Sequence, residues 1–134
     1  MCGIVGAIGH KQCSVVLLDA LKRLEYRGYD SSGIVTIHDS EIALERAVGK
    51  LVNLDLSLKE TPLFGDIGIG HTRWATHGGV STENAHPHVA SGRVAIVHNG
   101  IIENHRTIRA RLEAADHQFS SDTDSEVLAH LFVE

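Results

Sequence analysis

The sequence lacks the features that mark membrane, nucleic-acid-binding and disulfide-stapled proteins. Lysine and arginine number 12 against 17 aspartates and glutamates, and they form no basic cluster, which argues against a nucleic-acid partner. No window approaches the roughly 18 consecutive apolar residues of a transmembrane helix, and no signal-peptide pattern opens the chain. We therefore expect no membrane association and a cytoplasmic location.

Cysteine is also scarce, since only Cys2 and Cys13 are present. A reducing compartment and the absence of a spaced cysteine framework predict two free thiols. The 10 histidines invite a metal-binding interpretation. However, no zinc-protease or CxxC motif occurs, and His86-Pro87-His88 lacks cysteines or carboxylates at ligand spacing. We therefore expect no metal site, and we keep a histidine-rich metal-binding protein as a minor alternative.

A chain of 134 residues with 43% hydrophobic content is long enough for one folded domain. Alternating or short apolar runs predict strands, and apolar residues at helical spacing predict helices. The first strand, flanked by glycines, is expected to be buried on both faces. The predicted strands are Ile4–Ile8, Ile34–His38, Ile42–Val48, Asp66–His71 and Arg93–His98, and the predicted helices are Ser14–Leu24, Leu51–Leu58, Ile101–Ala115 and Thr123–Glu134.

Some local signals refine these elements. Gly28 is expected to stop the first helix. Asp39 and Ser40 are expected to join two strands as a hairpin. Thr123 and Glu126 have the spacing of a capping box at the start of the last helix, which reaches the end of the sequence without a stop signal. We therefore expect the chain to be part of a longer protein.

Cys2 is the first candidate for chemistry. Removal of Met1 would leave a cysteine whose thiol and α-amine belong to one residue. An α-amine has a pKa of about 7.7 to 8.0, so part of it is free base near neutral pH and can accept the thiol proton. The alternative is a small buried hydrophobic residue. A retained Met1 would acylate the amine and block its role as a base.

The stretch TRWATHGGVSTENAHPHVASG has neither helical nor strand periodicity, and loops of this length are usually functional. Arg73 offers a planar fork that suits a carboxylate, and Trp74 offers an apolar wall. The alternative is a surface arginine stacked on a tryptophan. The loop therefore contains a candidate site for a carboxylate ligand.

Two later positions add possible polar contacts. The carboxamide of Asn99 and the backbone N–H of Gly100 could donate to an oxyanion, or the pair could form an ordinary turn. Asp124 is expected in the first turn of the last helix, where it could complement the helix dipole or receive an ammonium group. These alternatives stay open on the residues alone.

Longer motifs carry a resemblance to a known family. MCGIVGAIG, RLEYRGYDSSGI, GHTRWATHG, NAHPH, VHNGIIENH and SDTDSEV occur in this order and cover the chain from residue 2 onward. They resemble the class II glutamine amidotransferases, and most closely the glutaminase domains of the glucosamine-6-phosphate synthase family. The resemblance implies an α+β fold of the N-terminal-nucleophile hydrolase type, an αββα sandwich of antiparallel sheets that residues 1–134 would complete only in part.

The resemblance also implies roles for individual residues. Cys2 would be the nucleophile that forms a γ-glutamyl thioester, with its own amine as base and with Asn99 and Gly100 as the oxyanion hole. Arg73 would hold the α-carboxylate of glutamine and Asp124 its α-ammonium. The further residues implied to bind substrate are Trp74, Thr76, His77, Arg27 and Gly28.

The family further implies partners. L-glutamine would be the substrate, no cofactor would be needed, and fructose 6-phosphate would bind two sugar-isomerase-type domains that lie outside residues 1–134. The full-length enzyme would be a homo-oligomer. Two alternatives remain: the glutaminase domain of an amidophosphoribosyltransferase, a sister family that lacks YRGYDS and RWATHG in these forms, and a binding module that senses glutamine without hydrolysing it.

Overall fold

The computed structural model describes residues 1–9 and 11–134. Six strands and four α-helices, with one short 3₁₀ helix, make up the described chain. In chain order the elements are β1 (Gly3–Ile8), α1 (Cys13–Leu24), η1 (Glu25–Arg27), β2 (Ser31–His38), β3 (Glu41–Val48), α2 (Leu51–Glu60), β4 (Ile67–Arg73), β5 (His88–Ala90), β6 (Val94–Ile96), α3 (His105–Ala114) and α4 (Glu126–Val133).

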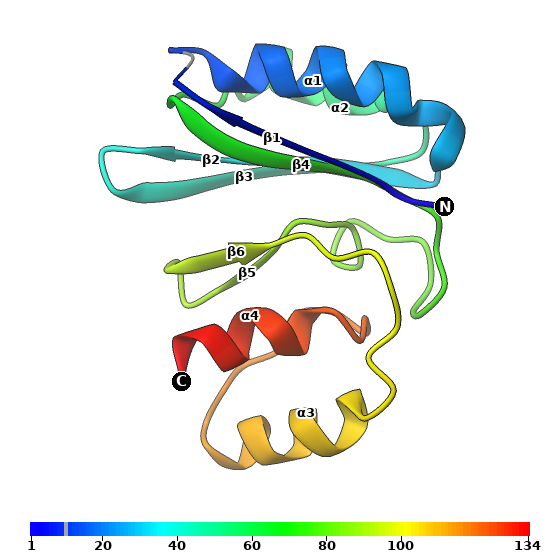
Figure 1. The fold of residues 1–134 in the computed structure, drawn as a ribbon, viewed down its shortest axis with the longest axis vertical. Helices are drawn as coiled ribbons and strands as arrows, with labels where there is room; N and C mark the ends of the chain where they lie inside the picture. The colour runs from blue at the N-terminus through cyan, green and yellow to red at the C-terminus, as the bar shows by residue number, and fades with distance from the viewer. Residues whose placement is uncertain (10) are drawn as a thin grey trace.

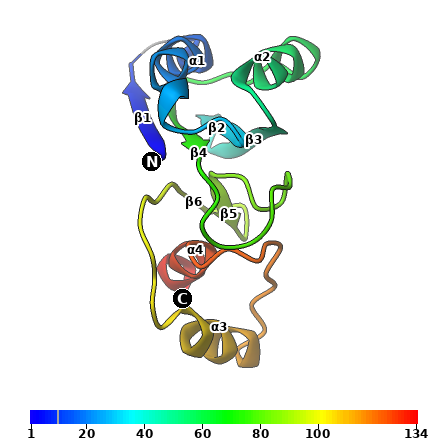
Figure 2. The same ribbon diagram turned by 90° about the vertical axis from the view of Figure 1, so that its right-hand side faces the viewer.

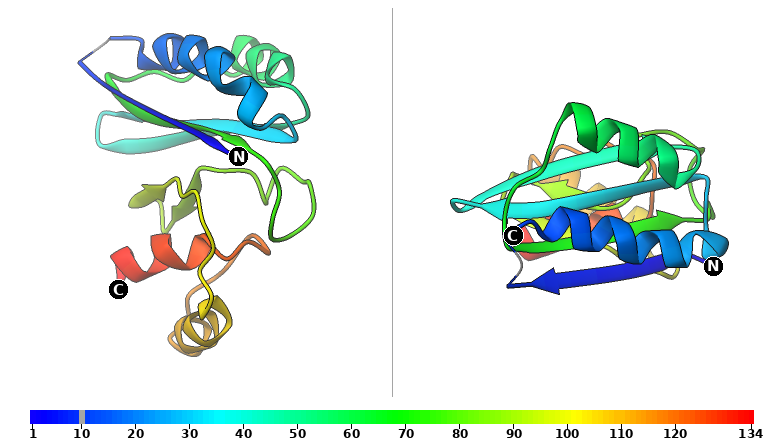
Figure 3. Two further views of the ribbon diagram at one scale, coloured as in Figure 1. Left: turned by 45° about the vertical axis from the view of Figure 1, so that its right-hand side comes forward. Right: turned by 90° about the horizontal axis from the view of Figure 1, so that it is seen from above.

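These elements form layers (Figure 1). One antiparallel sheet has the strand order β1-β4-β2-β3, and β5 and β6 form a second, two-stranded antiparallel sheet. Helices α1 and α2 lie side by side on the outer face of the larger sheet (Figure 3). The smaller sheet lies under its other face, followed by α4 and, outermost, α3 (Figure 2). The arrangement is the helix–sheet–sheet–helix layering expected from the resemblance.

The main apolar core lies between the larger sheet and its two helices. Leu17 and Leu21 of α1 and Leu51 and Leu54 of α2 pack with Ile34 of β2, and all five are almost completely buried. Their spacing along each helix is the one that predicted an amphipathic helix. The core therefore fixes the sheet whose far face carries the second layer.

Several local predictions are confirmed. Helix α1 ends at Leu24, the 3₁₀ turn follows, and Gly28 donates its N–H to the carbonyl of Glu25 at 3.0 Å. The β2–β3 hairpin turns at Asp39 and Ser40, whose φ angles of 49° and 64° fit a turn matched to the strand twist. Both connections keep the chain close to the sheet.

The prediction for the first strand is partly wrong. The strand exists, but β1 is the edge strand of the sheet and pairs only with β4. Ile4 is 42% exposed and Ile8 is 79% exposed, so the strand is not buried on both faces. A short apolar run does not distinguish an interior strand from an edge strand. The main-chain pairing with β4 holds the N-terminal segment in place.

The capping-box prediction for the last helix is wrong. Helix α4 begins at Glu126. The Glu126 carboxylate accepts hydrogen bonds from the backbone N–H groups of Ser120 at 2.9 Å and Ser121 at 2.7 Å. The Thr123 hydroxyl bonds the Nε2 of His88 at 2.8 Å instead of capping the helix. Asp124 therefore lies two residues before the helix, and tertiary hydrogen bonds have replaced the local cap.

The predicted strand after Gly92 is shorter than expected. It ends at Ile96 rather than at His98, and the following Asn-Gly pair does not close a hairpin. Helix α3 begins at His105, so the segment 97–104 is irregular. Among the described residues, no helix combines the length and apolar character that crossing a membrane requires.

Candidate active site

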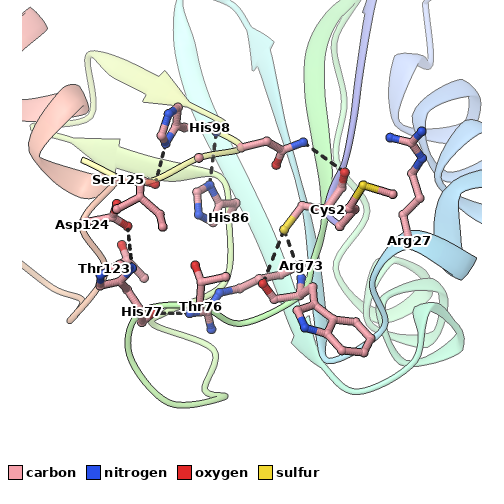
Figure 4. Close-up of a pocket in the computed structure, with 15 residues that line it drawn as sticks. Cys2, Arg27, Arg73, Thr76, His77, His86, His98, Thr123, Asp124 and Ser125 are labelled. Atoms are coloured by element: carbon pink, nitrogen blue, oxygen red, sulfur yellow. Dashed lines mark hydrogen bonds and ion pairs between the residues drawn. The ribbon is translucent and has the colours of Figure 1, made fainter. Parts of the chain in front are cut away.

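A pocket of about 480 Å³ opens where β1 begins, β4 ends and the segment after β6 passes. Every candidate site residue except Gly28 lines it, and they come from distant parts of the chain (Figure 4). The lining residues predicted from the sequence are Cys2, Arg27, Arg73, Trp74, Thr76, His77, Asn99, Gly100 and Asp124.

Cys2 is held at the start of β1. The backbone N–H of Trp74 donates to its Sγ at 3.1 Å, and the thiol lies 3.5 Å from the Trp74 carbonyl oxygen. The next residue, Gly3, donates its N–H to the hydroxyl of buried Thr72 at 3.2 Å. The thiol is half-buried and faces the pocket, which is the exposure that a reacting sulfur requires.

Asn99 and Gly100 pass close to Cys2. The Nδ2 of Asn99 donates to the carbonyl oxygen of Cys2 at 3.1 Å, so the carboxamide lies directly beside the cysteine. Gly100 has a φ of 151°, which a residue with a Cβ rarely adopts. This backbone shape explains the glycine, and it leaves both residues at the pocket wall.

Arg73 closes β4 and is only 3% exposed. Its Nη1 donates to the carbonyl of Gly79 at 2.9 Å, and its Nη2 donates to the carbonyl of His77. Burial lowers the pKa of the guanidinium below its ordinary value, while Asp30, Cys2 and Asp124 act in the opposite direction. Arg73 therefore organises the loop after β4 as well as lining the pocket.

Asp124 is also buried, at 3% exposure. Its Oδ2 accepts the N–H of Ile102 at 2.6 Å, and its Oδ1 lies 3.9 Å from the Nδ1 of His77. Figure 4 shows Asp124 and Cys2 on opposite sides of the pocket. A ligand between them would have a thiol at one end and a carboxylate at the other.

The remaining candidates shape the pocket. Trp74 is 49% exposed and meets the ring of Tyr29 edge to face, with ring centroids 5.8 Å apart. Gly28 lies behind the wall, because a Cβ on it would be 2.7 Å from the carbonyl carbon of Arg73. Gly28 therefore permits the close approach of η1 to the Arg73–Trp74 backbone rather than lining the pocket itself.

Several pocket residues were missed by the sequence analysis: His86, His98, Ile101, Thr123 and Ser125. His98 bonds the hydroxyl of Ser125 through its Nδ1 at 3.0 Å. His71, just behind the lining, bonds Asn99 through its Nε2 at 2.8 Å. His71 lies in the motif GHTRWATHG, and His86 and His88 belong to NAHPH, so the motifs contain these residues. Apart from His77, however, the histidines were considered only as metal ligands.

Burial favours the neutral form of three histidines near the pocket, His71, His86 and His88. Burial lowers the pKa of His71 to about 4 and also lowers that of His86, which faces other histidines. The pKa of His88 falls to about 4 despite the opposing charge of Glu126. Within residues 1–9 and 11–134, no group of three or more histidines, cysteines or carboxylates could hold a metal ion.

Comparison with known proteins agrees with this geometry. The family model described as the glutamine amidotransferase domain matches residues 56–134. The chain belongs to the glutamine amidotransferase domain family. The resemblance inferred from the sequence motifs is thus confirmed at the level of the family.

The glutamine amidotransferase domain is similar to the first part of longer proteins. It is 62% identical to glutamine–fructose-6-phosphate aminotransferase (isomerizing) of Mesorhizobium japonicum over 131 residues, which are 98% of this chain and 21% of that protein. The same enzyme of Zymomonas mobilis is 58% identical over 134 residues, which are 100% of this chain and 22% of that protein. The chain thus spans about a fifth of the length of these relatives.

Two solved structures share its fold. Glutamine phosphoribosylpyrophosphate amidotransferase from B. subtilis aligns with a TM-score of 0.82 at 26% identity, covering 100% of this chain and 29% of that one. The allosteric regulatory enzyme of purine biosynthesis gives a TM-score of 0.84 at 28% identity, covering 100% and 30%. The predicted α+β fold class, with antiparallel sheets layered between helices as in the N-terminal-nucleophile amidotransferases, is confirmed.

Proposed function

We propose that this domain hydrolyses the side-chain amide of L-glutamine to glutamate and ammonia through a thioester on Cys2. The observation that carries the proposal is the arrangement around one pocket. The Cys2 thiol lines the pocket, the carboxamide of Asn99 donates to the backbone carbonyl of the same cysteine, and buried Asp124 lies at the far side. This arrangement supports amide chemistry at one end of a ligand and recognition of a charged group at the other.

The reaction needs the free amine of Cys2. With Met1 removed, the α-amine accepts the thiol proton, and the sulfur adds to the amide carbon. The N–H groups of Asn99 and Gly100 donate to the oxygen of the substrate amide as it becomes negatively charged. Donors held in place for this charge lower the barrier to the addition of the sulfur. The C–N bond then breaks, the amine returns its proton to the departing nitrogen, and ammonia leaves. Water hydrolyses the thioester to glutamate and restores the thiol.

Recognition of glutamine is proposed to use opposite charges. The Arg73 guanidinium would hold the α-carboxylate, with those of its N–H groups that the loop carbonyls do not occupy. The Asp124 carboxylate would hold the α-ammonium. The loop residues Trp74, Thr76 and His77 would cover the bound ligand, and Arg27 and Gly28 would support the wall beside the nucleophile.

The activity of the whole protein is a further part of the proposal. Ammonia would pass to fructose 6-phosphate to give glucosamine 6-phosphate, in a cytoplasmic homo-oligomer whose sugar-binding domains lie outside residues 1–134. Identities of 53–62% to glutamine–fructose-6-phosphate aminotransferases support fructose 6-phosphate as the acceptor. The phosphoribosylpyrophosphate amidotransferase and the regulatory enzyme of purine biosynthesis, whose structures share the fold, are only 26% and 28% identical.

The two cysteines provide a matched test. We expect Cys2→Ala in the processed full-length protein to abolish glutamate release from glutamine. Cys13→Ala should retain the wild-type rate, because Cys13 is completely buried at the start of α1. Mass spectrometry of the wild type quenched in acid should detect a γ-glutamyl group on Cys2. Glutamate release by Cys2→Ala would refute the nucleophile. A wild type that binds glutamine but releases none would instead indicate a binding module.

The acceptor can be tested separately. Full-length protein would be supplied with glutamine and either fructose 6-phosphate or phosphoribosyl pyrophosphate. It should form an aminated product only with fructose 6-phosphate. Formation of phosphoribosylamine would overturn the proposed acceptor and leave the glutaminase step intact.

A further inference from the structure

We propose that His71 and His86 form a stacked positioning pair that fixes Asn99 in the orientation needed to stabilise the oxyanion. The inference rests on the proposed function and assigns these two histidines a role in that same site. The rings stack with centroids 4.2 Å apart and an interplanar angle of 17°. His71 is 0% exposed and His86 is 4% exposed, so the pair lies behind the pocket wall rather than in solvent.

The first contact of the pair holds a side chain. The Nδ2 of Asn99 faces the carbonyl oxygen of Cys2, which can only accept a hydrogen bond, so this contact fixes which end of the carboxamide is the donor. The Oδ1 of Asn99 then faces the Nε2 of His71 at 2.8 Å. His71 must therefore carry its proton on Nε2 and donate it to Asn99.

The other nitrogen of His71 agrees with this assignment. Its Nδ1 is buried without a hydrogen-bond partner among the described residues. In the neutral ring with the proton on Nε2, Nδ1 is a bare acceptor, and leaving it unpaired costs less than burying an unpaired N–H of a cation. The lowered pKa of His71, about 4, keeps this neutral form throughout the physiological range.

The second contact of the pair holds the backbone. The N–H of His98, the residue before Asn99, donates to the Nδ1 of His86 at 3.4 Å. One ring of the stack therefore contacts the main chain just before Asn99, and the other contacts its side chain. This segment is irregular, outside both sheets, so strand pairing cannot fix its geometry.

The contact has a chemical consequence for the donor. A hydrogen bond to the carboxamide oxygen polarises the amide, which makes its N–H groups stronger donors. The Nδ2 of Asn99 carries two hydrogens. One of them bonds the carbonyl oxygen of Cys2, so the other remains for the oxygen of the substrate amide. His71 acts through Asn99 and does not touch the substrate. It is a positioning residue, and its removal should affect the transition state more than the binding of glutamine.

The test compares three variants of the processed full-length protein. His71→Leu fills the space without a donor, and we expect kcat for glutamate release to fall about 10- to 100-fold with KM within about twofold. That loss is smaller than the 10²- to 10³-fold loss of a whole oxyanion donor. His71→Gln, whose amide N–H can replace Nε2–H, should recover most of kcat. His130→Leu, equally buried but bonded to His117, should keep the wild-type kcat.

A second readout separates positioning from general damage. Alkylation of Cys2 by iodoacetamide displaces iodide without forming an oxyanion, so His71→Leu should alkylate at the wild-type rate. A His71→Leu variant with normal kcat, a parallel loss of alkylation and kcat, or no recovery by His71→Gln would overturn the inference. If His71→Leu does not fold, His71→Asn replaces it, because its shorter amide cannot reach Asn99. A wild type without glutaminase activity would instead refute the proposed function.

Discussion

The two halves of the molecule solve different structural problems. Residues 1–73 form a continuous antiparallel sheet covered by two helices, and they contain the main apolar core. Residues 74–134 contain one short two-stranded sheet, two helices and long irregular segments, and they bury many polar groups, including Asn84, His88, Asp124 and Glu126. The pocket lies between the two halves.

The difference shows how the site divides its tasks. Cys2, the proposed nucleophile, directly precedes β1, whose main-chain pairing with β4 helps to fix its position. The proposed oxyanion and ammonium contacts lie on irregular backbone, which buried hydrogen bonds must hold. Buried polar networks of this kind are sensitive to a single loss, because each orphaned group then costs free energy. Loss of one buried polar contact at the pocket should therefore alter catalysis more selectively than a change in the apolar core of the first half.

Within the second half, the largest effect is expected at Asn99. Asn99→Ala removes a proposed oxyanion donor, so kcat for glutamate release should fall by about 10²- to 10³-fold while KM changes little. Steady-state kinetics of the processed full-length protein measures both. Asn104→Ala, an exposed asparagine just before α3, is the matched control and should retain wild-type kinetics. A loss of less than threefold at Asn99 would remove it from the oxyanion hole.

Acid should weaken the contact between the halves. The pKa of His71 is lowered to about 4 by burial, so between pH 6.5 and 4 the unfolded chain binds more protons than the folded chain. The free energy of unfolding should therefore decrease as the pH falls through this window, by about 3 kcal/mol from His71 once pH 4 is reached. Urea titrations with proteolysis of this domain, read by mass spectrometry, measure the trend.

His71→Gln provides the control for that titration. It keeps a donor toward Asn99 but cannot titrate, so its stability should depend less steeply on pH than that of the wild type. An identical slope in both proteins would show that His71 does not contribute to the acid response.

Asp124 provides a test of ligand charge. Asp124→Asn can keep an oxygen acceptor for the N–H of Ile102 but loses the charge. Charged hydrogen bonds contribute about 1.5 to 3 kcal/mol, so KM for glutamine should rise roughly 10- to 100-fold. Glutaramate, which lacks the α-ammonium group, should bind the wild type and the variant equally. Equal losses of affinity for both ligands would indicate a structural role instead.

The smallest effect is expected at Gly28, in the first half. A methyl group on Gly28 would lie 2.7 to 3.0 Å from backbone atoms of Arg73 and Trp74. Backbone atoms cannot relieve such a clash by changing rotamer, as a side chain could. Gly28→Ala should lower the stability of the domain by about 1 to 3 kcal/mol. Gly6→Ala, whose Cβ would make only ordinary contacts at 3.9 Å or beyond, should be near neutral. Thermal unfolding of both variants decides whether the close approach matters.

The sequence predicted the first half better than the second. Period and turn signals located every strand and α-helix up to β4, though not the 3₁₀ turn η1, because regular ladders and amphipathic helices leave periodic patterns. The edge position of β1 was missed, since strand order depends on partners that a local pattern does not encode. In the second half, β5 was missed within the segment predicted to be a loop, and the end of β6 and the starts of α3 and α4 were misplaced. Helix α4 begins later than predicted because Glu126 accepts hydrogen bonds from Ser120 and Ser121 rather than forming a local cap.

The candidate site was predicted from chemistry and from family motifs rather than from periodicity. Nine of the ten nominated residues line one pocket, with Gly28 behind it. The supporting histidines were missed because a buried, neutral imidazole has no spacing rule. Only the fold shows that His71 meets Asn99, 28 positions away. The roles of the nominated residues stay predictions for the experiments above.

The central claim is that the chain end itself carries out the chemistry, and Met1 provides its most direct test. Met1 lines the pocket beside Cys2, and while it is attached the cysteine amine is an amide and cannot accept a proton. Full-length protein would be prepared with Met1 removed and with Met1 retained, each verified by intact mass, and glutamate release would be compared. The account predicts activity only in the processed form. Glutamate release at the same rate with Met1 retained would contradict it.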